Sequence, residues 1–250
     1  MVFSKIKVES KALMIRKSQG IEGFGVPDIF ALIQSQGIYW IRYPLGPNTF
    51  CGCALLYQEE PVIVTNSSEI LAREFFTAAH ELAHVLFDLH QEGTPFIVDT
   101  SLEEGAIQNE REKRAYQFAA ELLLPRAKVN EYIQKVLRKS GKDLNAFDVV
   151  RIQTEFKVSY EAVLVRLHFL GYISKNQRER LKSEQDTRTS RALFSEIGVD
   201  DSLLRPWGQI GVSPQFLQWA NDNYRAGLIP YESLKRAYAL VGAEDRLPPK

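Results

Sequence analysis

The chain has 250 residues, of which 45% are hydrophobic and 25% are charged, and these values predict one compact domain plus a smaller helical module. Lys plus Arg and Asp plus Glu both total 31, so no overall charge attracts nucleic acid or an anionic membrane, and direct DNA binding is not expected. No run approaches the roughly 20 apolar residues of a membrane span, and the N-terminus lacks a signal peptide's apolar segment.

The first part of the chain predicts two helices followed by strands. Residues 1–25 give a weak helical signal, and a stronger one covers residues 28–36, which follow Pro27 and precede Gly37. Three runs of β-branched and aromatic residues then predict strands at 38–43, 52–57 and 61–65. The last two are joined by a short turn, and we expect a small, largely antiparallel sheet.

The two cysteines of the chain, Cys51 and Cys53, fall at the second of these strands. A disulfide across this spacing would be strained, and a metal site would need more thiolates. We therefore expect reduced thiols and a cytoplasmic protein.

A long helix follows the third strand. Its expected N-cap is Asn66, with Glu69 three residues later as in a capping box. Apolar residues occupy most of its sides, so we expect it to be buried between two layers. The helix carries His80-Glu81-x-x-His84. In this pattern two histidines one turn apart lie on one face and bind zinc, and the glutamate is the general base.

The rest of the chain is predominantly helical. A loop is expected over about 91–105, and the next helix runs from about residue 106 to 124 and stops at Pro125. The charged residues 174–192 predict an exposed linker or a solvated helix. Further helical patterns cover 127–139, 144–156, 160–171, 213–225 and 230–241.

Two histidines do not complete a catalytic zinc site, which usually has three protein ligands and a water. His90 stands at the metzincin position, but Phe87 replaces the glycine of that pattern, and no methionine follows for a Met-turn; its alternative role is to cap the helix end. Glu112 is the preferred third ligand, because it lies in line with apolar residues of the next helix, where a carboxylate needs a partner. The alternative role of Glu112 is a salt bridge to Arg73.

Two blocks of sequence support the same site. The first contains Asn66-Ser67-Ser68, Arg73 and the segment 76–84, and the second covers residues 112–125. Together they resemble the ImmA/IrrE family of metallo-endopeptidases. The chain departs from the family pattern at three positions, which are Ala83, Tyr116 and Leu124 in place of Gly, Asn and Met.

The resemblance implies His80, His84 and Glu112 as zinc ligands, with manganese as an alternative metal, and Glu81 as the catalytic base. Tyr116 is a candidate oxyanion donor, with packing as its alternative role.

The implied fold is an α+β, zincin-like metallopeptidase domain over residues 1–125, with a small antiparallel sheet and the zinc-binding helix. A helical, helix-turn-helix-like module follows over 126–172. Residues 173–192 are expected to be a charged linker, and residues 193–250 a C-terminal helical region.

The resemblance also implies a protein substrate, a helix-turn-helix transcriptional repressor of the XRE type, whose cleavage induces stress or mobile-element genes. The alternative is a regulator-binding protein of toxin or antitoxin type that keeps the zincin scaffold without cleaving. Direct DNA regulation is a third hypothesis, but a DNA-reading helix is expected to be basic, whereas residues 160–170 are mostly apolar.

Overall fold

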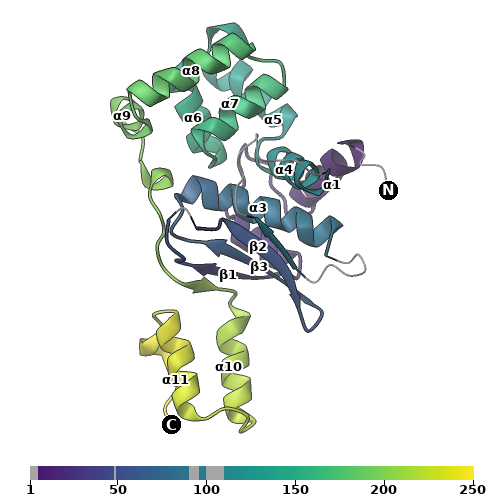
Figure 1. Cartoon of the computed structure of the whole chain (residues 1–250), viewed down its shortest axis with the longest axis vertical. Coiled ribbons are helices and arrows are strands. Elements are labelled where there is room, and N and C mark those ends of the chain that lie inside the picture. Colours follow the sequence, from purple (N-terminus) through teal and green to yellow (C-terminus); the bar gives the residue numbers. More distant parts are fainter. Residues whose placement is uncertain (1–4, 48, 90–95, 100–109) are drawn as a thin grey trace.

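The computed structural model describes residues 5–47, 49–89, 96–99 and 110–250, which form an α+β fold around a five-stranded sheet with the order β4-β2-β3-β1-β5. Helix α3 lies along one face of this sheet (Figure 1). The strands are β1 (Tyr39–Tyr43), β2 (Gly52–Tyr57), β3 (Glu60–Asn66), β4 (Phe96–Asp99) and β5 (Gly211–Val212).

The sheet is mixed: three of its four described strand pairs are antiparallel, in line with the largely antiparallel sheet expected from sequence, and one pair is parallel. Strand β3 forms a hairpin with β2 and lies between β2 and β1. The chain that leaves β1 skips the neighbouring position in the sheet and returns in the opposite direction as β2. Strand β3 then fills the skipped position and runs parallel to β1. The β1–β5 and β2–β4 pairs are antiparallel. Sequence patterns show where strands lie, whereas the order of strands depends on long-range pairing.

Strands β4 and β5 were not expected from sequence. Strand β4 falls inside the predicted loop 91–105. The other residues of that range are not among the residues that the structure describes. It pairs with β2, with Ile97 opposite Ala54. Strand β5 has two residues and β4 has four, which is at or below the shortest run in which period-2 alternation is recognised.

The helices α1 (Lys5–Ser18), α2 (Ile29–Ser35) and α3 (Leu71–Phe87) lie where helices were predicted, and α2 matches its predicted range to within one residue at each end. The predicted N-cap at Asn66 is wrong, because Asn66 is still the last residue of β3. Its side-chain amide donates to the carbonyl oxygens of Gly46 and Phe50, at 2.8 and 2.9 Å. Asn66 therefore fixes the loop between β1 and β2, and the helix begins five residues later.

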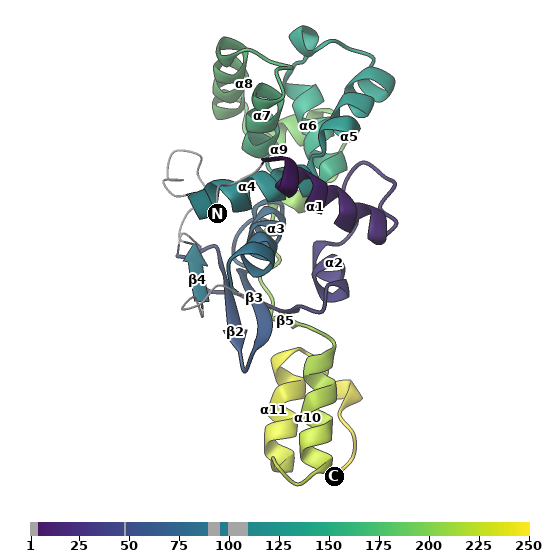
Figure 2. The ribbon, with the colours of Figure 1, turned by 90° about the vertical axis from the view of Figure 1, so that its right-hand side faces the viewer.

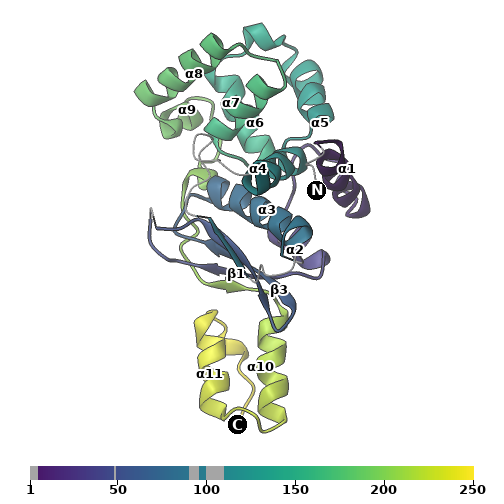
Figure 3. The same ribbon diagram turned by 45° about the vertical axis from the view of Figure 1, so that its right-hand side comes forward.

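Helix α3 is buried as predicted. It packs against β2 and β3 on one side and against α4 on the other, and Figure 3 shows it lying between the sheet and the helices above. The other described helices are α4 (Glu110–Leu123), α5 (Arg126–Glu131), the π-helical η2 (Tyr132–Leu137), α6 (Ala146–Phe156), α7 (Tyr160–Phe169), α8 (Lys175–Thr187), α9 (Ser190–Glu196), α10 (Gln215–Arg225) and α11 (Tyr231–Leu240). Three short 3-10 helices are η3 (Gly141–Asp143), η4 (Ser202–Leu204) and η5 (Glu244–Arg246).

The C-terminal end of α4 is held by Arg16 of α1. The guanidinium of Arg16 is buried and donates to the carbonyl oxygen of Leu122, 2.9 Å away, and to that of Gly23 at 2.7 Å. Burial lowers the pKa of Arg16 to about 10, so the side chain stays charged at neutral pH. Carbonyl groups in the last turn of a helix have no partner within the helix, and Arg16 supplies one.

Arg166 of α7 holds the same end of α4 from the other side. It donates to the carbonyl oxygen of Leu124 at 2.8 Å. It also makes two hydrogen bonds, of 2.9 and 2.6 Å, to the carboxylate of Glu121. Both partners of this ion pair are buried. The pair joins the helical module to the helix that carries Glu112.

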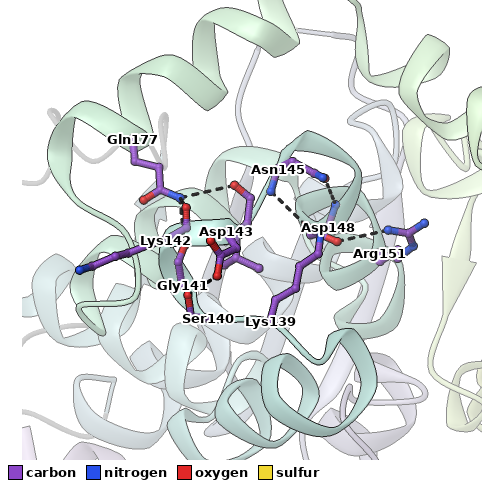
Figure 4. A network of polar contacts seen from close by, with 10 residues as sticks. Lys139, Ser140, Gly141, Lys142, Asp143, Asn145, Asp148, Arg151 and Gln177 are labelled. Atoms are coloured by element: carbon purple, nitrogen blue, oxygen red, sulfur yellow. Dashed lines mark hydrogen bonds and ion pairs between the residues drawn. The ribbon is translucent and has the colours of Figure 1, made fainter.

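The charged segment 174–192 was expected to be an exposed linker or a solvated helix, and it contains helix α8, which agrees with the second alternative. Leu181 of this helix is fully buried. The side-chain amide of Gln177 donates to the carbonyl oxygen of Gly141, 2.9 Å away, in the turn before α6 (Figure 4). The hydroxyl of Tyr160 also donates to the carbonyl oxygen of Leu181, 3.1 Å away. These apolar and hydrogen-bond contacts help to fix α8 on the helical module, and they are not visible in a charge pattern.

Helices α6 and α7 are joined by a short turn in which Lys157 has a positive φ of 56°. The two helices have the expected proportions, but the helix-turn-helix assignment stays a prediction. The residues of α7 between Val163 and Leu167 are all buried. A helix that reads DNA must expose a face to the groove, and α7 has little surface left for that.

Helices α10 and α11 form a hairpin with its own small core, built around Leu234 and Tyr238. The larger core is one cluster whose buried residues lie between Val8 and Phe194 in the sequence. Figure 2 shows the hairpin on the opposite side of the sheet from the helical module. The proposed domain boundaries stay predictions. Among the described residues, none of the helices combines the length and the apolar character of a membrane span.

Candidate metal centre

His80 and His84 lie one turn apart on helix α3, and their exposed fractions are 1% and 0%. The Nε2 atoms of the two imidazoles are 3.1 Å apart. The side chains therefore converge, as the spacing of four residues on a helix predicts. Both rings are held in place because α3 is packed on both sides.

Glu112 comes from the first turn of α4 and meets the two histidines. Its Oε2 atom lies 3.1 Å from His80 Nε2 and 3.5 Å from His84 Nε2. Metal–ligand bonds of about 2.0–2.2 Å at tetrahedral angles would separate the ligand atoms by roughly 3.3–3.6 Å. The observed distances are close to this range, so the three side chains fit a tetrahedral divalent ion. Arg73, the alternative partner of Glu112, instead pairs with Glu69 at 3.3 Å.

Asp88 supports this cluster and was missed in the sequence. Its Oδ2 atom lies 2.9 Å from Nδ1 of His84, and its other oxygen accepts a hydrogen bond from Arg114 of α4. The carboxylate is buried. A hydrogen bond at Nδ1 fixes the ring orientation and leaves Nε2 for the metal. The sequence did contain one signal for this role: Asp88 follows His84 by four residues, a spacing that places both side chains on one face of a helix.

We predict that Asp88→Asn weakens metal binding by about 10–100-fold, because loss of a carboxylate that hydrogen-bonds a ligating histidine has an effect of this size. The measurement is a competition titration of the metal-free protein against a chelating dye. The control is Asp186→Asn, an exposed aspartate on α8. Equal affinity in Asp88→Asn and in the unsubstituted protein would contradict the role assigned to Asp88.

Glu81 lies beside the cluster, fully buried between α3 and the sheet. A Cβ atom at Gly52 of β2 would lie 3.1 Å from Oε1 of Glu81 and 2.5 Å from Cγ2 of Thr77. The carboxylate therefore lies close against the backbone of β2, and the absent side chain at Gly52 leaves the space for it. No sequence signal distinguished Gly52 from any other strand glycine.

The sequence of the chain matches the family model described as the IrrE N-terminal-like domain, a peptidase family, over residues 33–168. That is more than half of the chain. The chain belongs to this family. The matched region includes all three candidate ligands and Glu81, from α3 and α4. No curated protein matches the chain significantly.

The structure thus brings together the residues singled out in the IrrE-type sequence, while their roles as ligands and base stay predictions. Tyr116 packs its ring against Phe76, with centroids 5.1 Å apart. This is the packing role considered as its alternative, and its role as an oxyanion donor is not tested by that contact. His90 lies outside the described residues.

Proposed function

We propose that this family member is a zinc-dependent endopeptidase, with manganese as the alternative metal. The observation that carries the proposal is the convergence of His80, His84 and Glu112. Two neutral imidazoles and one carboxylate are a donor set of catalytic zinc sites. When bound, the metal supplies a Lewis acid for a peptide carbonyl and a water of lowered pKa.

Glu81 is the proposed general base. Its carboxylate takes a proton from the attacking water and delivers it to the leaving amine. Its burial against β2 excludes bulk water from one side of the carboxylate. Asp88 has a positioning role, since its hydrogen bond to His84 Nδ1 keeps Nε2 turned towards the other two ligands.

The proposed substrate is a helix-turn-helix repressor of the XRE type in the cytoplasm, whose cleavage induces stress or mobile-element genes. The support for this substrate is the resemblance of the two sequence blocks to ImmA/IrrE endopeptidases, together with the family match over residues 33–168.

The test mixes the purified chain with the XRE-type repressor encoded next to its gene. Zinc-loaded protein is expected to release discrete fragments. Removal of the metal with a chelator is expected to stop cleavage, and added zinc to restore it. Fragments are followed by mass spectrometry, which also locates the cut bond. A stable complex without fragments, in the presence of bound zinc, would contradict the proposal and favour the non-cleaving alternative.

A further inference from the structure

Gly52 is the first residue of strand β2 and is buried against helix α3. A glycine in a strand weakens the sheet, and it often marks a place where another group approaches the backbone closely. A Cβ atom at Gly52 would lie 2.5 Å from Cγ2 of Thr77, 3.0 Å from the carbonyl oxygen of Val64 and 3.1 Å from Oε1 of Glu81. Non-bonded heavy atoms in a packed interior lie about 3.5–4.0 Å apart. Position 52 therefore has no room for a side chain while these groups stay where they are.

The two side chains that approach Gly52 come from one face of α3. Thr77 and Glu81 are four residues apart, so they lie one above the other on the helix. Their exposed fractions are 1% and 0%. Glu81 also follows His80 directly in the sequence. The contact with Gly52 thus lies at the edge of the candidate metal centre, and it involves the proposed general base.

Neither backbone at this contact can withdraw easily. Gly52 pairs with Thr65 of β3 on one side and with Asp99 of β4 on the other. Helix α3 is packed between the sheet and α4, as Figure 3 shows. Protein interiors are close-packed and adjust poorly to added volume. A methyl group at position 52 would therefore be accommodated mainly by movement of the side chains of Thr77 and Glu81.

We propose that Gly52 is a positioning residue for the general base. Because Gly52 has no side chain, the carboxylate of Glu81 can lie against β2, and this placement sets where the carboxylate takes up its proton. The inference rests on the proposed function. It adds a residue of β2 to a site whose other members come from α3 and α4.

Gly52→Ala is expected to lower the kcat of repressor cleavage by at least about tenfold, because a misplacement of about 1 Å can reduce a rate by roughly 100-fold. The metal content per chain, measured by atomic absorption, is expected to stay unchanged, since the three candidate ligands are not among the atoms that the methyl group meets. KM is expected to stay within about twofold, as for a change that affects the transition state alone. An unchanged kcat would overturn the proposal.

Gly211→Ala is the matched control. Gly211 is a buried glycine of the same sheet, in β5, and a Cβ atom there would lie 2.8 Å from the ring of Trp207 instead of against α3. Both variants are expected to unfold at a temperature lower by roughly 2–12 °C, because overpacking of a buried site is destabilising. Only Gly52→Ala is expected to lose kcat. An equal loss of kcat in the control would overturn the proposal.

Thr77→Ser separates positioning from packing. Serine lacks the Cγ2 atom, which is the atom closest to a Cβ at position 52. In the double variant Gly52→Ala with Thr77→Ser, the unfolding temperature is expected to recover most of its loss relative to Thr77→Ser alone. The kcat is expected to stay low, because the contact with Oε1 of Glu81 remains. Recovery of kcat together with the unfolding temperature would overturn the proposal, since packing alone would then explain Gly52.

A thermal measurement on the metal-free protein tests the contact without using cleavage. In the Thr77→Ser background, the decrease in unfolding temperature caused by Gly52→Ala is expected to be smaller by roughly 2 °C or more when Glu81→Ala is also present, because contacting residues are coupled. Equal decreases with and without Glu81→Ala would overturn the proposal. Absence of cleavage by the unsubstituted protein would instead contradict the proposed peptidase activity, which this measurement does not use.

Discussion

Glu81→Gln is expected to abolish cleavage while the bound metal is retained. The amide keeps the size of the side chain but cannot take a proton from water. General base catalysis contributes about 10²–10⁴-fold to a rate, so the cleavage rate is expected to fall by at least that factor. His84→Ala is expected to lose both cleavage and metal, because it removes one of the three converging donors.

Two readouts on the same samples separate these variants. The metal content per chain is measured by atomic absorption after dialysis, and the initial rate of repressor cleavage is measured by gel densitometry. The control is Glu179→Gln, an exposed glutamate on α8. A Glu81→Gln protein that cut the repressor at the unsubstituted rate would rule out the assignment of Glu81 as base.

Glu121→Ala is expected to destabilise the chain by about 3–5 kcal/mol, because it leaves the buried charge of Arg166 without its carboxylate partner. For a chain of this size, a change of about 1 kcal/mol shifts the melting temperature by roughly 2–4 °C. The expected decrease is therefore roughly 6–20 °C in a thermal unfolding scan. Metal affinity is expected to fall as well, since the pair holds the helix that carries Glu112.

The double variant Glu121→Leu with Arg166→Met is the matched control. Apolar residues of similar volume remove both charges at once, and such replacements of buried pairs are often neutral or stabilising. Here one hydrogen bond from Arg166 to the carbonyl oxygen of Leu124 is also lost, at a cost of about 1 kcal/mol. The double variant should therefore be clearly more stable than Glu121→Ala. Equal destabilisation of both would show that packing, rather than the uncompensated charge, governs this contact.

Much of the local structure could be predicted from the sequence. Strands β1, β2 and β3 and helices α2, α6 and α7 lie within one or two residues of the predicted ranges, because their apolar periodicity and turn residues are local signals. The start of α3 was misplaced at Asn66. An asparagine side chain can cap a helix or fix a loop, so the residue type does not tell these two roles apart. Only the pairing of β3 with its neighbours shows that Asn66 belongs to the strand.

The sequence by itself determined that His80 and His84 would face one point beside Glu81, because residues four apart on a helix share a face whatever surrounds them. It also indicated Glu112, through the cost of an inward carboxylate on an apolar stripe. Only the tertiary structure decided that Glu112 meets both histidines and that Asp88 links His84 to Arg114. These features join elements far apart in the chain, and their distances depend on how α3, α4 and the helical module pack rather than on any local spacing.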